Sequence, residues 1–83
     1  MSLIARSPEQ LGAHIKHLRQ QRGLSQSQLA DLAATRQEMV SIIERGHGGA
    51  KISTLLDLLQ ALDADLTLAA RAKPTATEVL DIF

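Results

Sequence analysis

Three long polar side chains, Arg36, Gln37 and Glu38, follow Thr35 in the segment TRQEMVSIIERG, at the start of what reads as a short helix. An arginine guanidinium can bond bidentately to O6 and N7 of guanine, and a glutamine amide can do the same with N6 and N7 of adenine. These residue types in this place predict contacts with base edges, provided that the neighbouring elements turn them outward.

The residues give little support to other chemistries. His14 and His17 stand three apart and could share a metal ion, but no cysteine or carboxylate completes a ligand set, so we expect both to face solvent. No spacing of serine, histidine and aspartate indicates a nucleophile with its base, and GHGG is a flexible linker rather than a phosphate loop. Phe83 is the single aromatic residue, too few for a platform that stacks single-stranded bases. We therefore expect no enzyme activity, no metal and no cofactor, and sequence-specific binding to double-stranded DNA remains.

Length and composition bound the organisation of the chain. Its 83 residues make one domain, too small to bury a large core alone, so a homodimer is a natural supplement. The absence of cysteine excludes disulfides and thiolate metal sites. The start of the chain lacks the basic-then-apolar pattern of a signal peptide, and no apolar run approaches the ~18 residues of a membrane span. We expect a soluble, cytoplasmic protein with no membrane contact.

Charge is distributed unevenly along the chain although the net charge is zero. Residues 1–52 hold seven Lys and Arg against four Asp and Glu, a net +3, whereas residues 53–83 hold two against five, a net −3. Because contacts of Lys and Arg with phosphate usually dominate nucleic-acid binding, the basic first part suits DNA. The acidic second part predicts a different partner.

Capping signals predict a first helix over about residues 8–22. Ser7 with Pro8 and Gln10 gives an N-cap, a proline at the first helical position and a partial capping box. Gly23 can end this helix in the left-handed conformation.

Two shorter helices are predicted to follow. Ser25 with Gln28 repeats the capping box before QSQLADLA. Thr35 with Glu38 repeats it again before MVSII, and Gly46 is the predicted stop.

A fourth helix, a strand and a tail are predicted after the loop GHGGA. The run ISTLLDLLQAL spreads six apolar residues over an arc of roughly 160°, wider than one neighbour needs. These six are Ile52, Leu55, Leu56, Leu58, Leu59 and Leu62. Residues 65–71, DLTLAAR, alternate in the manner of a short strand, which needs a partner. KPTATE then suggests a loose end, so we divide the chain into a domain over residues 1–72 and a flexible tail over residues 73–83.

Helices this short depend on tertiary packing, so their apolar residues must meet in one core. We predict a core of Leu11, Ile15, Leu18, Leu24, Leu29, Ala30, Val40, Ile43, Ile52, Leu55, Leu59 and Leu62. With these residues turned inward, the polar start of the third helix points outward. Because only LAAT joins the second and third helices, the arrangement is a helix-turn-helix, whose second helix enters the major groove by its N-terminal end.

The segment GLSQSQLADLAATRQEMVSIIERG resembles the helix-turn-helix of the lambda-repressor and Cro type, also called XRE-type. The matching positions are Gly23, Leu24, Ser25, Gln26, Leu29, Ala30, Val40, Ile43, Glu44 and Gly46. The opening SPEQLGAHIKHLRQQRG and the ending ALDADLTLAARAKP resemble HipB-type antitoxins, so the likeness covers residues 7–74.

The resemblance implies an all-α, lambda-repressor-like domain of four to five short helices, with a short C-terminal strand that pairs across a dimer. It further implies a homodimer that represses its own operon and binds a HipA-type serine/threonine kinase toxin. Two other functions remain open. One is a plain helix-turn-helix repressor without a toxin, and the other is an adaptor that uses this fold for protein contacts only, which the zero net charge permits.

The family's operator contacts, carried over by position, fall on Gln26, Arg36, Gln37, Glu38 and Ser41. Gln26 would position a phosphate, and Ser41, one turn along the third helix, could reach a base or a phosphate. Looser phosphate candidates are Lys51, Arg45, Lys16 and Arg22, and of these we include Lys51 among the predicted contacts. Lys16 and Arg22 fit solvated helix faces better.

Two glutamates have structural interpretations beside any contact with DNA. A carboxylate near phosphates is unfavourable, so Glu38 is better explained as the third residue of the capping box that Thr35 begins. The resemblance assigns Glu44 to an internal ion pair with Arg19.

Val79, Leu80, Ile82 and Phe83 give the end of the chain, EVLDIF, an apolar character that the leucine-rich core does not require. One interpretation is a frayed end without function. The other is a short hydrophobic anchor for the toxin, kept soluble by Glu78 and Asp81 and ordered only on binding.

Overall fold

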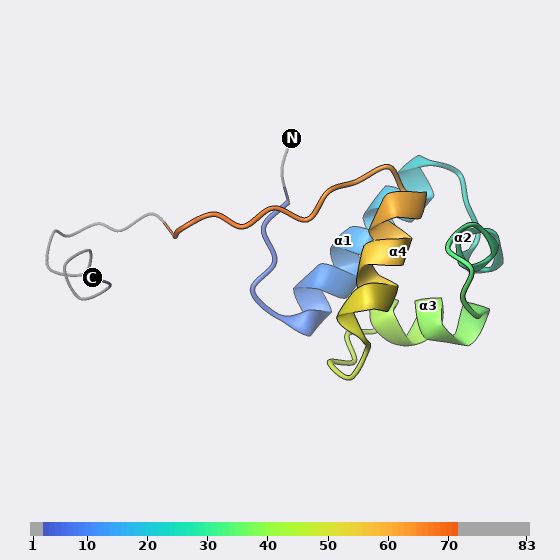
Figure 1. Cartoon of the computed structure of the whole chain (residues 1–83), viewed down its shortest axis with the longest axis horizontal. Coiled ribbons are helices and arrows are strands. Elements are labelled where there is room, and N and C mark those ends of the chain that lie inside the picture. The colour runs from blue at the N-terminus through green and yellow to red at the C-terminus, as the bar shows by residue number, and fades with distance from the viewer. Residues whose placement is uncertain (1–2, 72–83) are drawn as a thin grey trace, which may run out of the picture.

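A computed structural model describes residues 3–71 of the protein. They form four helices: α1 (Pro8–Gln21), α2 (Gln26–Leu32), α3 (Gln37–Glu44) and α4 (Ile52–Ala61). α3 packs against α1 and α2, and α2 also packs against α4 (Figure 1). The predicted all-α class and the helix-turn-helix order are confirmed. Within residues 3–71, no helix is long and apolar enough to cross a membrane.

Two of the three predicted N-terminal caps are formed. Ser7 accepts a hydrogen bond from the backbone N–H of Gln10 at 3.1 Å, and Pro8 occupies the first turn of α1. At α2 the capping box is complete, because Ser25 accepts from the N–H of Gln28 at 3.0 Å while the Gln28 side chain accepts from the N–H of Ser25 at 2.8 Å. These reciprocal bonds satisfy donors that the first turn of a helix leaves free.

The predicted capping box of Thr35 and Glu38 is wrong. The N-cap of α3 is Arg36, and its side chain makes no capping hydrogen bond. The turn before α3 uses one more residue than the sequence suggested, because Ala34 adopts φ +55° and the N–H of Thr35 bonds back to the carbonyl of Ala30 at 2.9 Å. Glu38 is therefore the second residue of α3 and exposed, and its charge lies in the first turn, where an acidic side chain is favourable.

The core draws on all four helices and on the residues that follow α2 and α4. It consists of Ile15, Leu29, Ala30, Ala33, Val40, Ile43, Leu58, Leu59 and Leu62. Ile52, which we predicted to be buried, is 70% exposed. α4 contributes Leu58, Leu59 and Leu62 to the core from its C-terminal half, whereas Ile52 and Leu56, one turn apart and nearer its start, are exposed.

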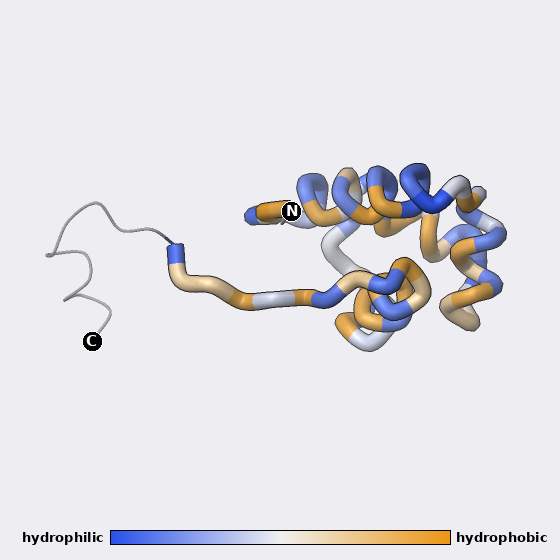
Figure 2. Tube along the Cα trace, turned by 90° about the horizontal axis from the view of Figure 1, so that it is seen from above, coloured by the Kyte–Doolittle hydropathy of each residue, from blue (hydrophilic) through white to orange (hydrophobic). Residues whose placement is uncertain are grey.

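α1 and α3 approach each other closely at Gly12. A Cβ atom added there would come within 2.2 Å of the carbonyl oxygen of Ile43 and 2.9 Å of that of Glu44. Glycine is required by this approach, since any side chain would push the two helices apart. The contact fixes α3 on α1, whose hydrophilic residues face away from the other helices (Figure 2).

Residues 64–71 leave the helical body as a segment without regular secondary structure (Figures 1 and 2). The strand predicted for residues 65–71 is not formed here, because a strand needs hydrogen bonds to a second strand and the described part of this single chain offers none. Leu68, in the middle of the segment, is 95% exposed. The predicted tail, including Val79, Leu80, Ile82 and Phe83, lies outside the described residues.

Candidate nucleic-acid interface

Gln26 and Gln37 begin α2 and α3, respectively, and the turn between the two helices brings their side chains together. Nε2 of Gln37 donates a hydrogen bond to Oε1 of Gln26 at 2.8 Å, across a separation of eleven residues. Gln26 is half-buried, whereas Gln37 is exposed. The N-terminal ends of α2 and α3 therefore lie on one surface of the protein. This agrees with the prediction that the polar start of α3 points outward.

Behind this pair, Glu44 and Arg19 form the predicted ion pair. Nε of Arg19 lies 2.6 Å from Oε2 of Glu44, and its second terminal nitrogen donates to Oε1 at 3.0 Å. The remaining terminal nitrogen donates to the carbonyl of Leu24 at 2.8 Å. The guanidinium therefore connects α1 to α3 and to the turn that precedes α2. Arg19 is 9% exposed and the Glu44 side chain 3%, which makes this a buried, bidentate pair.

The ion pair continues into the exposed glutamines. Nε2 of Gln26 donates to Oε1 of Glu44 at 3.1 Å. A continuous chain of hydrogen bonds thus runs from buried Arg19 through Glu44 and Gln26 to exposed Gln37. The sequence analysis identified all four residues but did not predict that they are connected. The two bonds of Gln26 join residues 18 and 11 positions apart in the sequence, and only the packing of α3 brings these residues together.

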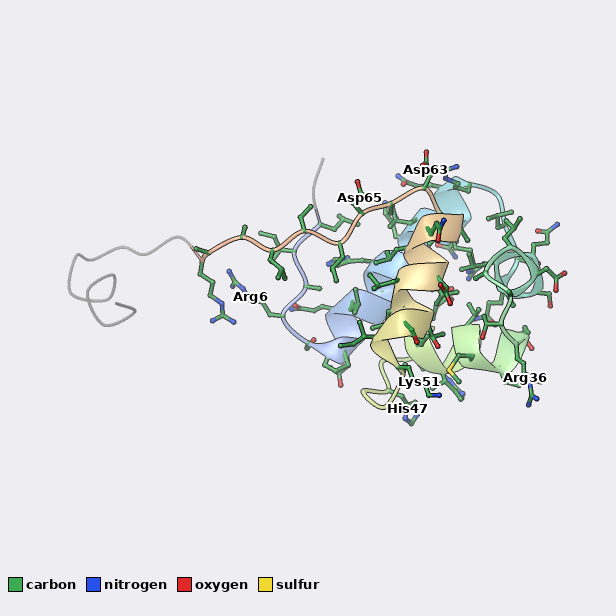
Figure 3. The ribbon with its side chains drawn as sticks, viewed as in Figure 1. Arg6, Arg36, His47, Lys51, Asp63 and Asp65 are labelled. Carbon is green, nitrogen blue, oxygen red and sulfur yellow. The ribbon has the colours of Figure 1, made fainter. Side chains whose placement is uncertain are left out.

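The other predicted contact residues surround the start of α3. Arg36 and Glu38 are exposed, Ser41 is half-buried one turn further along, and Lys51 is the exposed N-cap of α4. In Figure 3, Arg36 and Lys51 project from the side of the molecule occupied by α3, whereas Asp63 and Asp65 lie on the opposite side. Arg36 and Lys51 are therefore separated in space from Asp63 and Asp65.

The looser phosphate candidates differ in their surroundings. Lys16 is exposed on α1. Nε of Arg45 donates to the carbonyl of Ser41 at 3.3 Å, which holds its side chain along α3. Arg22 lies 3.5 Å from Asp63 at the acidic end of the molecule, in agreement with its interpretation as a surface charge.

The two histidines of α1 are not equivalent, and for His14 the prediction was wrong. Its Nε2 lies 2.6 Å from the carbonyl oxygen of Ile4, and the ring is half-buried beneath the segment that precedes α1. Packing by that segment could not be read from a helical pattern. His17 is exposed. Within residues 3–71, no group of three or more His, Cys, Asp and Glu side chains could hold a metal ion.

Two helices joined by a short turn, with the second presenting its polar first turn to solvent, define a helix-turn-helix domain. Residues 10–72 match the family described as a helix-turn-helix domain. The chain is 36% identical to the antitoxin HipB of Escherichia coli O6:H1 (strain CFT073) over 92% of its own length and 83% of the relative's.

Solved structures agree with this likeness. A chain of the HipA-HipB-O2-O3 complex has a TM-score of 0.77 and 32% identity, and covers 83% of this chain and 97% of that one. A chain of the HipB-O4 20mer complex gives the same values. The chain thus belongs to the helix-turn-helix family and, within it, to the HipB antitoxins, which confirms the resemblance read from the sequence.

Proposed function

We propose that this protein is an antitoxin that represses its own operon. It binds operator DNA as a homodimer and also binds a HipA-type serine/threonine kinase toxin. The observation that carries this proposal is the exposed start of α3, where Gln37 is held by Gln26, in a chain that belongs to the HipB antitoxins. In this proposal the protein acts in the cytoplasm by binding DNA and the toxin, and it catalyses no reaction.

Gln37 and Arg36 are the proposed readers of base edges. Both are exposed at the N-terminal end of α3, the end that a recognition helix inserts into the major groove. Gln37 would bond to adenine and Arg36 to guanine. Glu38, in the same turn, would face the groove, where a carboxylate can accept only from an amino group such as N4 of cytosine.

Gln26, Ser41 and Lys51 are the proposed positioning contacts with the sugar-phosphate backbone. Lys51 lies on the same side as Arg36 in Figure 3, and Ser41 lies one turn along α3 from Gln37. Such contacts orient the domain on the duplex and carry no sequence information.

The exposed apolar residues of α4 and the segment after it support the homodimer. Ile52 and Leu56 are exposed on α4, and the exposed Leu66 and Leu68 follow on residues 64–71. Pairing of residues 65–71 with the same segment of a second copy would bury these leucines and give the strand its partner. A two-fold dimer would place two α3 helices about 34 Å apart, one turn of DNA.

The acidic side and the tail are the proposed contacts with the toxin. Asp63 and Asp65 lie away from α3, so a partner on that side could bind while DNA occupies the other (Figure 3). Residues 73–83 would form the flexible tail of the domain, with Val79, Leu80, Ile82 and Phe83 as its anchor. A buried aromatic anchor is the kind of residue that dominates interface energies.

The direct test measures the affinity of the protein for duplex DNA from upstream of its own gene and for random duplexes, over a series of salt concentrations. Replacing Gln37 by Ala should cost ~1–3 kcal/mol on the upstream DNA and little on random DNA. Replacing Lys51 by Ala should weaken both alike and flatten the salt slope by about one unit. No measurable affinity for either duplex at any salt concentration would instead indicate a protein-only adaptor.

The toxin part is tested separately. A kinase gene beside this one, whose product binds the purified protein and loses its toxicity when the two are co-expressed, is the expected result. Specific DNA binding without such a partner would identify a plain repressor.

A further inference from the structure

The hydrogen-bond chain from Arg19 to Gln37 has a direction that its chemistry imposes. An ionised carboxylate can only accept hydrogen bonds, whereas a glutamine amide has a donor end and an acceptor end. Oε1 of Glu44 already accepts from Arg19 at 3.0 Å, and it lies 3.1 Å from the amide of Gln26. The end of Gln26 that faces Glu44 must therefore be Nε2, since an oxygen there would leave two acceptors in contact with no hydrogen between them.

The orientation of Gln26 in turn determines the orientation of Gln37. Because Nε2 of Gln26 donates to Glu44, the Gln26 atom that faces Gln37 is Oε1, which is again an acceptor. Gln37 must then present Nε2 to it, at the observed 2.8 Å. Because the Glu44 side chain is 3% exposed and Gln26 is half-buried, water has little access to the bond between Gln26 and Glu44, which sets the orientation of the Gln26 amide.

We propose that Glu44 is a positioning residue for sequence reading, which orients the Gln37 amide through Gln26 so that Gln37 selects adenine over guanine. One of the two Nε2 hydrogens of Gln37 is used by Gln26. What remains for DNA is one hydrogen and the acceptor Oε1. Adenine offers one acceptor, N7, and one donor, N6, which match this pair, whereas guanine offers two acceptors, N7 and O6, which would need both hydrogens.

The inference rests on the proposed function, because it requires Gln37 to face a base. It goes beyond the proposed function because it assigns the selectivity for adenine partly to Glu44 and Gln26, which need not contact a base. A purely structural Glu44 would support affinity for every sequence equally. A positioning Glu44 changes the ratio of affinities for adenine and guanine at one base pair.

The DNA experiment compares duplexes from upstream of the gene in which each adenine is replaced in turn by guanine. At the position read by Gln37, the wild-type protein should prefer adenine by about 5- to 150-fold. Gln26→Ala should lower that ratio by about fivefold or more, since the freed amide of Gln37 can then rotate. Loss of a phosphate contact by Gln26 would weaken both duplexes and leave the ratio unchanged.

Gln28→Ala is the matched control. Gln28 lies on the same helix and its amide caps α2, but it does not belong to the chain that leads to Gln37. This substitution should reduce stability while keeping the adenine preference. Glu44→Gln should lower the preference as Gln26→Ala does, and the double variant should lower it no further, because both changes break one relay.

A second readout follows the free protein and needs no DNA. In nuclear magnetic resonance spectra, Glu44→Gln should shift the side-chain NH₂ signals of Gln26 and of Gln37, although Gln37 does not touch Glu44. The NH₂ signals of Gln28 and Gln10 should stay in place.

The outcomes separate the two proposals. An adenine preference that Gln37→Ala abolishes but Gln26→Ala leaves intact would overturn the relay and keep base reading. Unmoved Gln37 signals in Glu44→Gln would overturn it as well. Shifted signals without any adenine preference in the wild-type protein would show a connected network but refute base reading by Gln37, and with it the role assigned to Glu44.

Discussion

Replacing Arg19 by Met should destabilise the protein strongly, because it leaves the Glu44 carboxylate buried without its cation. The guanidinium contributes two bonds to Glu44 and one to the carbonyl of Leu24, and all three are lost. Removing one partner of a buried ion pair costs about 3–5 kcal/mol. At about 0.05–0.15 kcal/mol per residue, the 83 residues supply only about 4–12 kcal/mol, so the variant would lose about a quarter or more of the total stability.

The assay is thermal unfolding followed by circular dichroism, at one protein concentration because a dimer's stability depends on it. A loss of about 3–5 kcal/mol corresponds to a fall in Tm of roughly 12–40 °C for a domain of this size. Arg22→Met is the matched control. Arg22 pairs with Asp63 at 3.5 Å, with side chains 47% and 88% exposed, and such surface pairs contribute about 0–1 kcal/mol.

A second variant tests whether the cost comes from the uncompensated charge. Replacing Glu44 by Leu in the Arg19→Met background should recover much of the lost stability, since a buried ion pair can often be exchanged for apolar residues of similar volume. The reasoning would be refuted if Arg19→Met lowered Tm no more than Arg22→Met.

Three further changes have expected outcomes. Gly12→Ala should separate α1 from α3 and cost about 1–3 kcal/mol in chemical denaturation, whereas Gly49→Ala, which meets no atom within 4 Å, should be neutral. Truncation after Asp63 should give a folded chain that sediments mainly as a monomer and binds upstream DNA poorly, because it removes residues 65–71; a tight truncated dimer would contradict the proposed interface. Deletion of residues 78–83 should leave DNA affinity unchanged and weaken binding to the kinase by the loss of the Phe83 anchor, and equal kinase affinity would make the tail passive.

The local chemistry of the sequence determined the helices and their order. Ser7, Ser25 and Gln28 form capping hydrogen bonds with backbone groups three residues away, and Gly23 and Gly46 adopt φ +68° and +92°, a region that residues with side chains enter less readily. These signals act within a few residues of the chain. For that reason the helix-turn-helix, its outward polar start and the family resemblance could all be predicted without a structure.

Tertiary packing decided which of several locally acceptable arrangements is used. Thr35 is a favourable N-cap residue type, as Ser25 is, but the turn that seats α3 on α1 starts the helix one residue later, so Glu38 loses its predicted partner. The apolar arc of α4 is wider than its contact with the core, and only the packing of the helices decides that Leu58 is buried and Ile52 exposed.

The hydrogen-bond chain from Arg19 to Gln37 likewise could not be predicted from the sequence. The residue types were evident in the sequence, and the pairing of Arg19 with Glu44 followed from the resemblance. The bonds that Gln26 makes to Glu44 and to Gln37 depend on distances of 3.1 and 2.8 Å between side chains on different helices. Hydrogen bonds weaken steeply when these distances and angles change, so only the assembled fold determines which polar side chains meet.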